Sequence, residues 1–178
     1  MAEPTESIVL GGGCFWCTEA VFSRLRGVVS AVSGYAGGTV PNPTYEQVCE
    51  DTTGHAEVSR VEFDPGQVSL DQLLEVFFYV HDPTSLNRQG ADVGTQYRSI
   101  ILYTQESQRP VIERRLRRAQ EEHPRPVVTQ VGPLEQFYPA EAHHQHYFER
   151  HPSQGYCALT IQPKVAKAER HFPELLRG

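Results

Sequence analysis

Residues 7–26 read SIVLGGGCFWCTEAVFSRLR and pass from an apolar segment, through three glycines, into a helical pattern. The apolar residues at its start predict a short buried strand that stops at the glycines. After Cys14, apolar residues recur at helical spacing as far as about Arg26, and Gly27 is a typical helix stop. Cys14 therefore stands at a junction between a strand and a helix.

The rest of the chain continues this alternation of strands and helices. Ser69, with Gln72 three residues later, forms a capping-box pattern that predicts the start of a second helix. A loop rich in glycine and proline is expected at 34–43. The other expected elements are strands at 28–33, 57–63, 96–103 and 127–131, and helices at about 108–122 and 140–150.

The first six elements follow the order β-α-β-β-α-β. This order predicts an α+β protein with a ferredoxin-like, two-layer split βαβ core and a mixed or antiparallel sheet. The length of 178 residues suits a single catalytic domain, 1–178, with a core at about 6–150 and a coil-rich tail at 151–178. Such folds host many functions, so the fold alone selects none.

The composition excludes several classes of protein. Sixteen Lys and Arg against 22 Asp and Glu give a net charge of −6, which argues against binding to nucleic acid or to an anionic membrane surface. The longest uncharged apolar stretch, Val76–Val80, is far shorter than the roughly 20 residues that cross a bilayer. The acidic N-terminal residues, 1–6, lack the basic and apolar parts of a signal peptide. We expect a cytoplasmic protein.

Cys14 is the first candidate for chemistry, because a cysteine at the start of a helix is next to free N–H groups and the positive end of the helix dipole. Both stabilise a thiolate, which predicts a lowered pKa and a nucleophilic sulfur. Phe15 and Trp16 add flat apolar surfaces suited to gripping a small apolar group. The alternative is a small core cysteine with ordinary aromatic neighbours.

Cys14 and Cys17 also form a C-x-x-C pair, which supports two rival interpretations. One is a zinc-binding module that adds ligands from the histidines at 143–151, although a second tight ligand pair is absent. The other is a general thioredoxin-like disulfide exchanger. The exchanger explains neither Glu57, which we expect to be buried, nor the tyrosine-bearing glycine loops.

Glu57 belongs to the predicted strand at 57–63. The period of two in a strand puts its side chain on the same face as the apolar Val61 and Phe63. A carboxyl on a core face has a raised pKa and can be a neutral acid near pH 7. In the alternative, Val58 faces the core and Glu57 is exposed at an edge.

Taken together, these segments resemble the A-type peptide methionine sulfoxide reductases. The resemblance covers roughly 8–156, in order and with compatible spacing. The blocks that carry it are Gly12–Trp16, Gly34–Gly38, Pro43–Tyr45, Thr53–Glu57, His81–Pro83 and Gln89–Ser99.

The resemblance implies a role for each matched residue. Cys14 would attack the sulfoxide sulfur, Phe15 and Trp16 would line the pocket for the substrate methyl group, and Glu57 would protonate the sulfoxide oxygen. The remaining polar residues implied at the site are Tyr35 and Tyr97, as further donors, and Asp92. The substrates would be free methionine sulfoxide and oxidised proteins, with the S epimer at sulfur. No metal or organic cofactor is expected, because thiols supply the electrons.

The attack leaves a sulfenic acid on Cys14, which a second thiol converts to a disulfide. Cys17 lies one helical turn away, and Cys157 resembles the resolving cysteine that many members carry near the C-terminus. Many members have glycine in place of Cys17 and a further cysteine after Cys157, so both candidates stay open. Cys157 is favoured, because a flexible tail could reach Cys14 without straining the helix. Thioredoxin or a similar dithiol would then reduce the disulfide of an enzyme expected to be a monomer.

Overall fold

A computed structural model describes residues 4–177 of the protein. Residues 1–3, the first half of the acidic N-terminal stretch, lie outside these described residues. The prediction that residues 1–6 do not form a signal peptide therefore stays a prediction. Within 4–177, no helix is long and apolar enough to cross a membrane.

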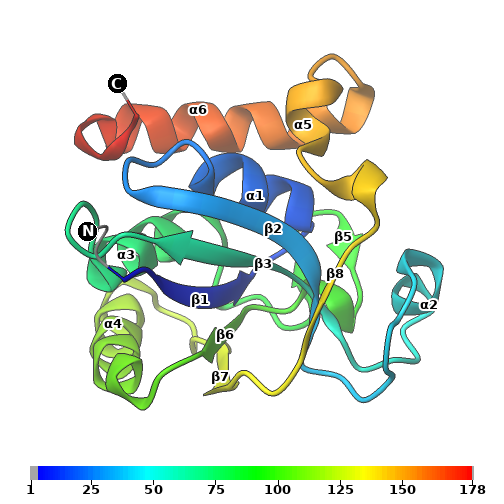
Figure 1. Cartoon of the computed structure of the whole chain (residues 1–178), viewed down its shortest axis with the longest axis horizontal. Coiled ribbons are helices and arrows are strands. Elements are labelled where there is room, and N and C mark those ends of the chain that lie inside the picture. The colour runs from blue at the N-terminus through cyan, green and yellow to red at the C-terminus, as the bar shows by residue number, and fades with distance from the viewer. Residues whose placement is uncertain (1–3, 178) are drawn as a thin grey trace.

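A curled mixed sheet forms the centre of the α+β fold (Figure 1). Within the described chain its order is β7-β6-β1-β3-β2-β8, and every neighbouring pair is antiparallel except the parallel pair β6 and β7. The strands of this sheet are β1 (Glu6–Gly11), β2 (Val28–Ala36), β3 (Ala56–Phe63), β6 (Ile100–Tyr103), β7 (Gln130–Pro133) and β8 (Phe137–Pro139). A separate two-stranded ribbon consists of β4 (Arg88–Gln89) and β5 (Asp92–Val93).

Helices cover one face of the sheet. Helix α1 (Phe15–Phe22) contacts β2 and β3 on one side and α6 (Gln162–His171) on the other, as Figure 1 shows. The other helices are α2 (Tyr45–Cys49), α3 (Leu70–Val80), α4 (Arg109–Glu122) and α5 (Tyr147–Arg150). The predicted capping box of α3 is confirmed, because Ser69 accepts from the Gln72 N–H and Gln72 accepts from the Ser69 N–H. Seven of the eight residues of α1 are buried, so the helix that follows Cys14 belongs to the main core.

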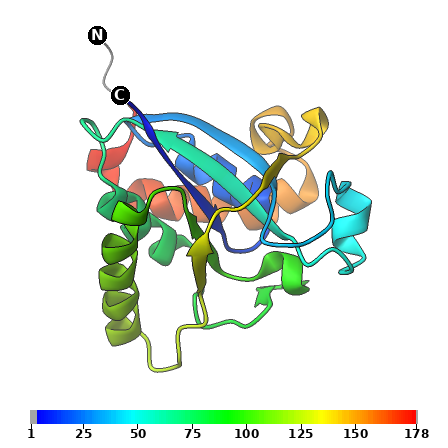
Figure 2. The same cartoon turned by 60° about the horizontal axis from the view of Figure 1, so that its bottom comes forward.

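The opposite face of the sheet carries a smaller apolar cluster that includes Val9 and Val58. Strands β7 and β8 pair with opposite edges of the sheet, so the chain between them crosses this face, as the yellow segment in Figure 2 shows. Leu134 and Phe137 of this crossing pack against the cluster. Val58 therefore faces away from the main core, and the expectation that Glu57 shares a face with Val61 and Phe63 is confirmed.

Several element boundaries differ from the expected ones. The glycine loop begins later than expected, because β2 extends through Ala36 and pairs with both β3 and β8. The expected strand at 96–103 begins only at Ile100, after a 3-10 turn at Thr95–Tyr97. The expected helix at 140–150 is broken into Ala142–His144 and α5, because His146 adopts a left-handed backbone with φ 53°.

The expectation of a coil-rich tail is wrong. A π-helical turn at Cys157–Ile161 runs directly into α6, and a 3-10 turn follows at Pro173–Leu175. Val165 and Ala168 of α6 are buried in the main core. Tertiary burial of this apolar stripe stabilises a helix that the composition of the tail did not suggest.

Candidate active site

The glycine run brings the start of α1 close to its neighbours. A side chain on Gly12 would place its Cβ 2.7 Å from Cδ2 of the buried His81 ring, so this position has no room for one. Gly13 has φ +92°, a backbone conformation that glycine adopts without strain, and its N–H donates to the carbonyl oxygen of Tyr97 at 3.2 Å. The turn thus fixes Cys14 against the segment that carries Tyr97.

Cys14 is buried, with 7% of its surface exposed. Burial raises the pKa of the Cys14 thiol well above its ordinary value, and the nearby Glu57 and Cys17 raise it further. The expected lowering of this pKa by the helix end is therefore wrong, because the effect of burial is larger. The N–H of Trp16 does favour the thiolate, but the first free N–H of the helix, that of Phe15, donates to Glu57 instead.

Glu57 is 1% exposed and lies directly opposite Tyr35 in the pairing of β2 with β3. Burial raises the pKa of the Glu57 carboxyl to about 8, an effect that the Phe15 N–H opposes and Asp92 reinforces. Its Oε1 accepts from the Phe15 N–H at 3.2 Å, whereas its Oε2 has no hydrogen-bond partner within the described residues. Near pH 7 the side chain is a neutral acid with one oxygen free for a further partner.

Tyr97 and Tyr35 have different surroundings. Burial raises the pKa of the Tyr97 phenol, and Glu57 and Cys14 raise it further, so this hydroxyl is a proton donor beside both. The hydroxyl of Tyr35 donates to Oε1 of Glu141 at 3.1 Å, so the hydrogen that the resemblance implied for the substrate is engaged by Glu141. Tyr35 thus lies in the core near Glu57, but its hydroxyl already donates a hydrogen bond to Glu141.

Two further tyrosines belong to the same region, and the sequence reading gave neither a role. Burial raises the pKa of Tyr45, at the start of α2, and Glu57 raises it further. The pKa of Tyr156 is raised by burial and then by Cys14 and Cys17, and its hydroxyl donates to Asp92 at 2.7 Å. Tyr45 is the last residue of the Pro43–Tyr45 block, and Tyr156 directly precedes Cys157. These two positions in the sequence could have indicated that both tyrosines belong to the site.

Aromatic rings surround the start of α1. Phe15 is fully buried, and its ring centroid lies 5.6 Å from that of Tyr35 and 6.2 Å from that of Tyr45. Trp16 is half-buried and stacks on Tyr147 with a centroid distance of 3.8 Å. The expected apolar surfaces next to Cys14 are therefore part of a larger aromatic cluster.

The two other candidate thiols both lie in the main core. Cys17 is 4% exposed, and burial raises its pKa although Nζ of Lys164 lies 4.0 Å from its sulfur. Cys157 is fully buried in the π-helical turn, close enough to Cys17 to influence its pKa. All four cysteines are free thiols, and Cys49 is exposed. Cys157 is thus in helical structure rather than on the coil that the sequence suggested.

A cavity of about 1070 Å³ opens beside this region. Asp92 and Tyr156 line it at the edge of the site, and Lys164 lines it next to Cys17. The cavity extends away between α3, α4 and α6, and none of the described residues that line it is a cysteine.

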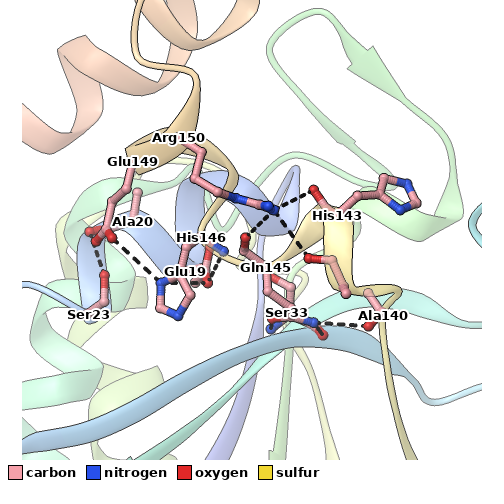
Figure 3. A network of polar contacts seen from close by, with 11 residues as sticks. Glu19, Ala20, Ser23, Ser33, Ala140, His143, Gln145, His146, Glu149 and Arg150 are labelled. Carbon is pink, nitrogen blue, oxygen red and sulfur yellow. Dashed lines mark hydrogen bonds and ion pairs between the residues drawn. The ribbon is translucent and has the colours of Figure 1, made fainter.

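The segment between β8 and the tail is tied to α1 and β2 by polar contacts, which Figure 3 shows. Glu19 of α1 is buried and accepts from the His146 N–H at 2.7 Å, while Gln145 exchanges hydrogen bonds with the backbone of Ser33. Arg150 donates to three carbonyl oxygens of the same segment: those of Ala142, His143 and Gln145. These contacts hold the residues that surround Trp16.

One group of side chains within residues 4–177 has the spacing of a metal site: Glu141, His143 and His144. It includes neither Cys14 nor Cys17, so the zinc module proposed from the C-x-x-C pair is not assembled. Nδ1 of His144 accepts the indole N–H of Trp16 at 3.2 Å, which puts the ring proton on Nε2 and leaves no lone pair for a metal. Two ligands remain, fewer than a structural zinc site requires.

A sulfur nucleophile next to a neutral carboxylic acid can attack an electrophilic atom while the acid protonates a leaving oxygen. With further free thiols nearby, the product can be recycled through a disulfide. This chemistry defines the class of the protein as a thiol-dependent oxidoreductase.

Comparisons with known proteins identify the family. The family model described as peptide methionine sulfoxide reductase matches residues 6–176. The peptide methionine sulfoxide reductase MsrA of Saccharolobus solfataricus is 54% identical over 97% of both chains. Among solved structures, reduced Mxr1 from Saccharomyces cerevisiae is similar with a TM-score of 0.80 and 32% identity, over 88% of this chain and 92% of that one. Mxr1 in complex with Trx2 is similar with a TM-score of 0.57 and 25% identity, over 83% of this chain and 88% of that one. The chain belongs to the peptide methionine sulfoxide reductase family.

Proposed function

We propose that the protein reduces the S epimer of methionine sulfoxide, free or within proteins, with Cys14 as nucleophile and Glu57 as acid. The observation that carries these roles is the hydrogen bond from the Phe15 N–H to Glu57, which ties a neutral carboxyl to the residue after Cys14. In the reaction the Cys14 sulfur attacks the sulfoxide sulfur as Glu57 protonates its oxygen. The thiol of Cys14 loses its proton to solvent before the attack. The oxygen then ends on Cys14 as a sulfenic acid that carries the proton from Glu57, methionine leaves, and Glu57 takes up a proton from solvent.

The surrounding residues would bind the substrate and stabilise the developing charge. Phe15 and Trp16 supply apolar surface for the substrate methyl group, and Tyr97 is a protonated donor beside Glu57 and Cys14. Asp92, held by Tyr156, adds a negative charge that helps to keep the proton on Glu57. Tyr35 contributes by holding Glu141 rather than as a donor to the oxygen.

Recycling needs a second thiol and an external reductant. Cys157 condenses with the Cys14 sulfenic acid, forming the disulfide and releasing water, with Cys17 as the alternative partner. A dithiol protein then reduces the disulfide, and the similarity to Mxr1 in complex with Trx2 supports thioredoxin in this role. Because the cycle needs free thiols, a reducing cytoplasmic location is part of the proposal.

The ferredoxin-like description of the core is also part of this proposal. The inner strand order β6-β1-β3-β2, with α1 and α3 in the connections, is the order of a split βαβ unit and supports it.

The test compares Cys14→Ser with Cys49→Ser, a matched change at an exposed cysteine, using dithiothreitol as reductant. We expect Cys14→Ser to form no methionine from either epimer, and Cys49→Ser to reduce the S epimer at the rate of the unmodified protein. Appreciable turnover by Cys14→Ser, or reduction of only the R epimer, would contradict the proposal.

A further inference from the structure

Trp16 is the only tryptophan of the chain, and the residues around it come from the segment after β8. Its ring stacks on Tyr147 at 3.8 Å and an interplanar angle of 6°, and it meets the edge of Tyr156 at 5.9 Å. Its Nε1–H donates to Nδ1 of His144 at 3.2 Å. The stacking fixes the plane of the indole, and the hydrogen bond fixes its rotation within that plane.

His144 is itself held in one place. It is 3% exposed, and its ring centroid lies 4.4 Å from that of Tyr45 and 5.4 Å from that of Phe15. An indole N–H can only donate, so Nδ1 must be the acceptor and the proton of the neutral ring is on Nε2. Nε2 has no hydrogen-bond partner within residues 4–177. Burial lowers the pKa of His144, in agreement with the neutral form that this bond requires.

We propose that His144 is a positioning residue, which holds the indole of Trp16 in the orientation that receives the substrate methyl group. This inference rests on the proposed role of Trp16 in substrate binding. Without an acceptor at Nδ1, the half-buried indole N–H would be unsatisfied, and the ring would turn to find another acceptor. The flat surface beside Cys14 would then no longer match the substrate.

The contributions of the two ring nitrogens of His144 can be tested separately. The side-chain oxygen of asparagine can take the position of Nδ1, whereas the amide of glutamine reaches the position of Nε2. His144→Asn therefore keeps the acceptor for Trp16, and His144→Gln removes it while keeping a polar group at the Nε2 end. His143→Gln, the same change at the exposed neighbouring histidine, is the matched control.

The experiment measures KM and kcat for methionine sulfoxide and the near-ultraviolet circular dichroism of the single tryptophan. A neutral hydrogen bond contributes about 1 kcal/mol, so we expect His144→Gln to raise KM about fivefold with little change in kcat. The tryptophan signal of this variant should weaken. We expect His144→Asn to keep both KM and signal close to those of the unmodified protein, and His143→Gln to change neither.

A double-mutant cycle with Trp16→Phe, which keeps a ring but removes the N–H, tests whether the effect passes through this bond. We expect Trp16→Phe to raise KM, and the double variant Trp16→Phe with His144→Gln to be no worse than the more affected single variant. If Trp16→Phe raises KM but His144→Gln does not, the positioning role is wrong and the proposed pocket survives. If Trp16→Phe leaves KM unchanged, the proposed role of Trp16 fails and the inference fails with it. A larger loss in His144→Asn than in His144→Gln would also overturn the inference, because it would assign the role to Nε2.

Discussion

The backbone N–H of Phe15 donates to Oε1 of Glu57 at 3.2 Å, so the residue that follows Cys14 holds the Glu57 carboxyl through its main chain. Among side-chain changes only proline would remove this main-chain donor, which leaves Oε2 of Glu57 without a partner within the described chain. The position of Glu57 relative to Cys14 is therefore set by the pairing of β3 with β2 and by the start of α1.

Glu57→Gln should slow the reductive step without unfolding the protein. The glutamine oxygen can still accept from Phe15, but an amide cannot release a proton to the sulfoxide oxygen. We expect the single-turnover rate to fall by about 100-fold or more, the range for loss of a general acid. Glu62→Gln, on the same strand but on its other face, is the control and should keep the rate. An unchanged rate in Glu57→Gln would refute the acid role.

The pH dependence of kcat/KM should be bell-shaped. The pKa of Glu57 is raised to about 8 and that of Cys14 is higher still, so below pH 8 both groups hold their protons. The reaction needs Glu57 and Cys14 to hold one proton between them: Glu57 must keep a proton for the sulfoxide oxygen, and the Cys14 sulfur must be free to attack. We therefore expect kcat/KM to rise up to about pH 8 and to fall only when Cys14 has also ionised.

Glu57→Gln distinguishes the two limbs of this profile. Without the acid, only the thiolate is required, so kcat/KM of the variant should rise with the ionisation of Cys14 and show no alkaline decline. The measurement is single-turnover methionine formation from pH 6 to 11. If kcat/KM of the unmodified protein rises with pH and never declines, the proton on Glu57 is not needed for the reaction.

The disulfide formed after one turnover without reductant should join Cys14 to Cys157. Both lie in the main core, and π-helical turns such as the one at Cys157–Ile161 recur at functional sites. Peptide mapping by mass spectrometry identifies the pair directly. We expect Cys157→Ser to accumulate the Cys14 sulfenic acid and Cys17→Ser to form the disulfide normally. A bond between Cys14 and Cys17 in the unmodified protein would reverse this assignment.

Glu19→Gln should alter the pH dependence of stability. Burial raises the pKa of Glu19 from 4.5 to about 7, so the folded state binds this proton more tightly than the unfolded state does. The resulting stabilisation is complete below pH 4.5 and is lost as pH rises through about 7. Each tenfold change in proton affinity is worth about 1.4 kcal/mol, so this shift corresponds to a loss of at most about 3.5 kcal/mol.

Glutamine at position 19 keeps the acceptor for the His146 N–H but has no charge to bury. Urea unfolding at pH 5 and pH 8 should therefore show a smaller decrease in stability for Glu19→Gln than for the unmodified protein. Glu149→Gln, in the same network but exposed, should keep most of the pH dependence, because Glu149 contributes less than burial does to the raised pKa of Glu19. Equal pH dependence in Glu19→Gln would contradict the raised pKa.

Local patterns predicted much of the fold and part of the site. The period of two in β3 predicted the buried face of Glu57, and the capping box predicted the start of α3, because both depend on residues a few positions apart. The tail was predicted as coil because its helix is stabilised by burial against α1 and α3, which involves residues far away in the chain. Tyr45 and Tyr156 were missed for the same reason, since each reaches the site from a distant element.

The sequence alone was enough to place Cys14 after a glycine turn at a helix start and Glu57 on the buried face of a strand, because these are local properties; the roles of nucleophile and acid remain the proposal. The protonation state of Cys14 and the partners of the tyrosines were decided by tertiary structure alone. Burial, the proximity of Glu57 and the hydrogen bonds to Glu141 and Asp92 act across space between segments that the sequence keeps apart.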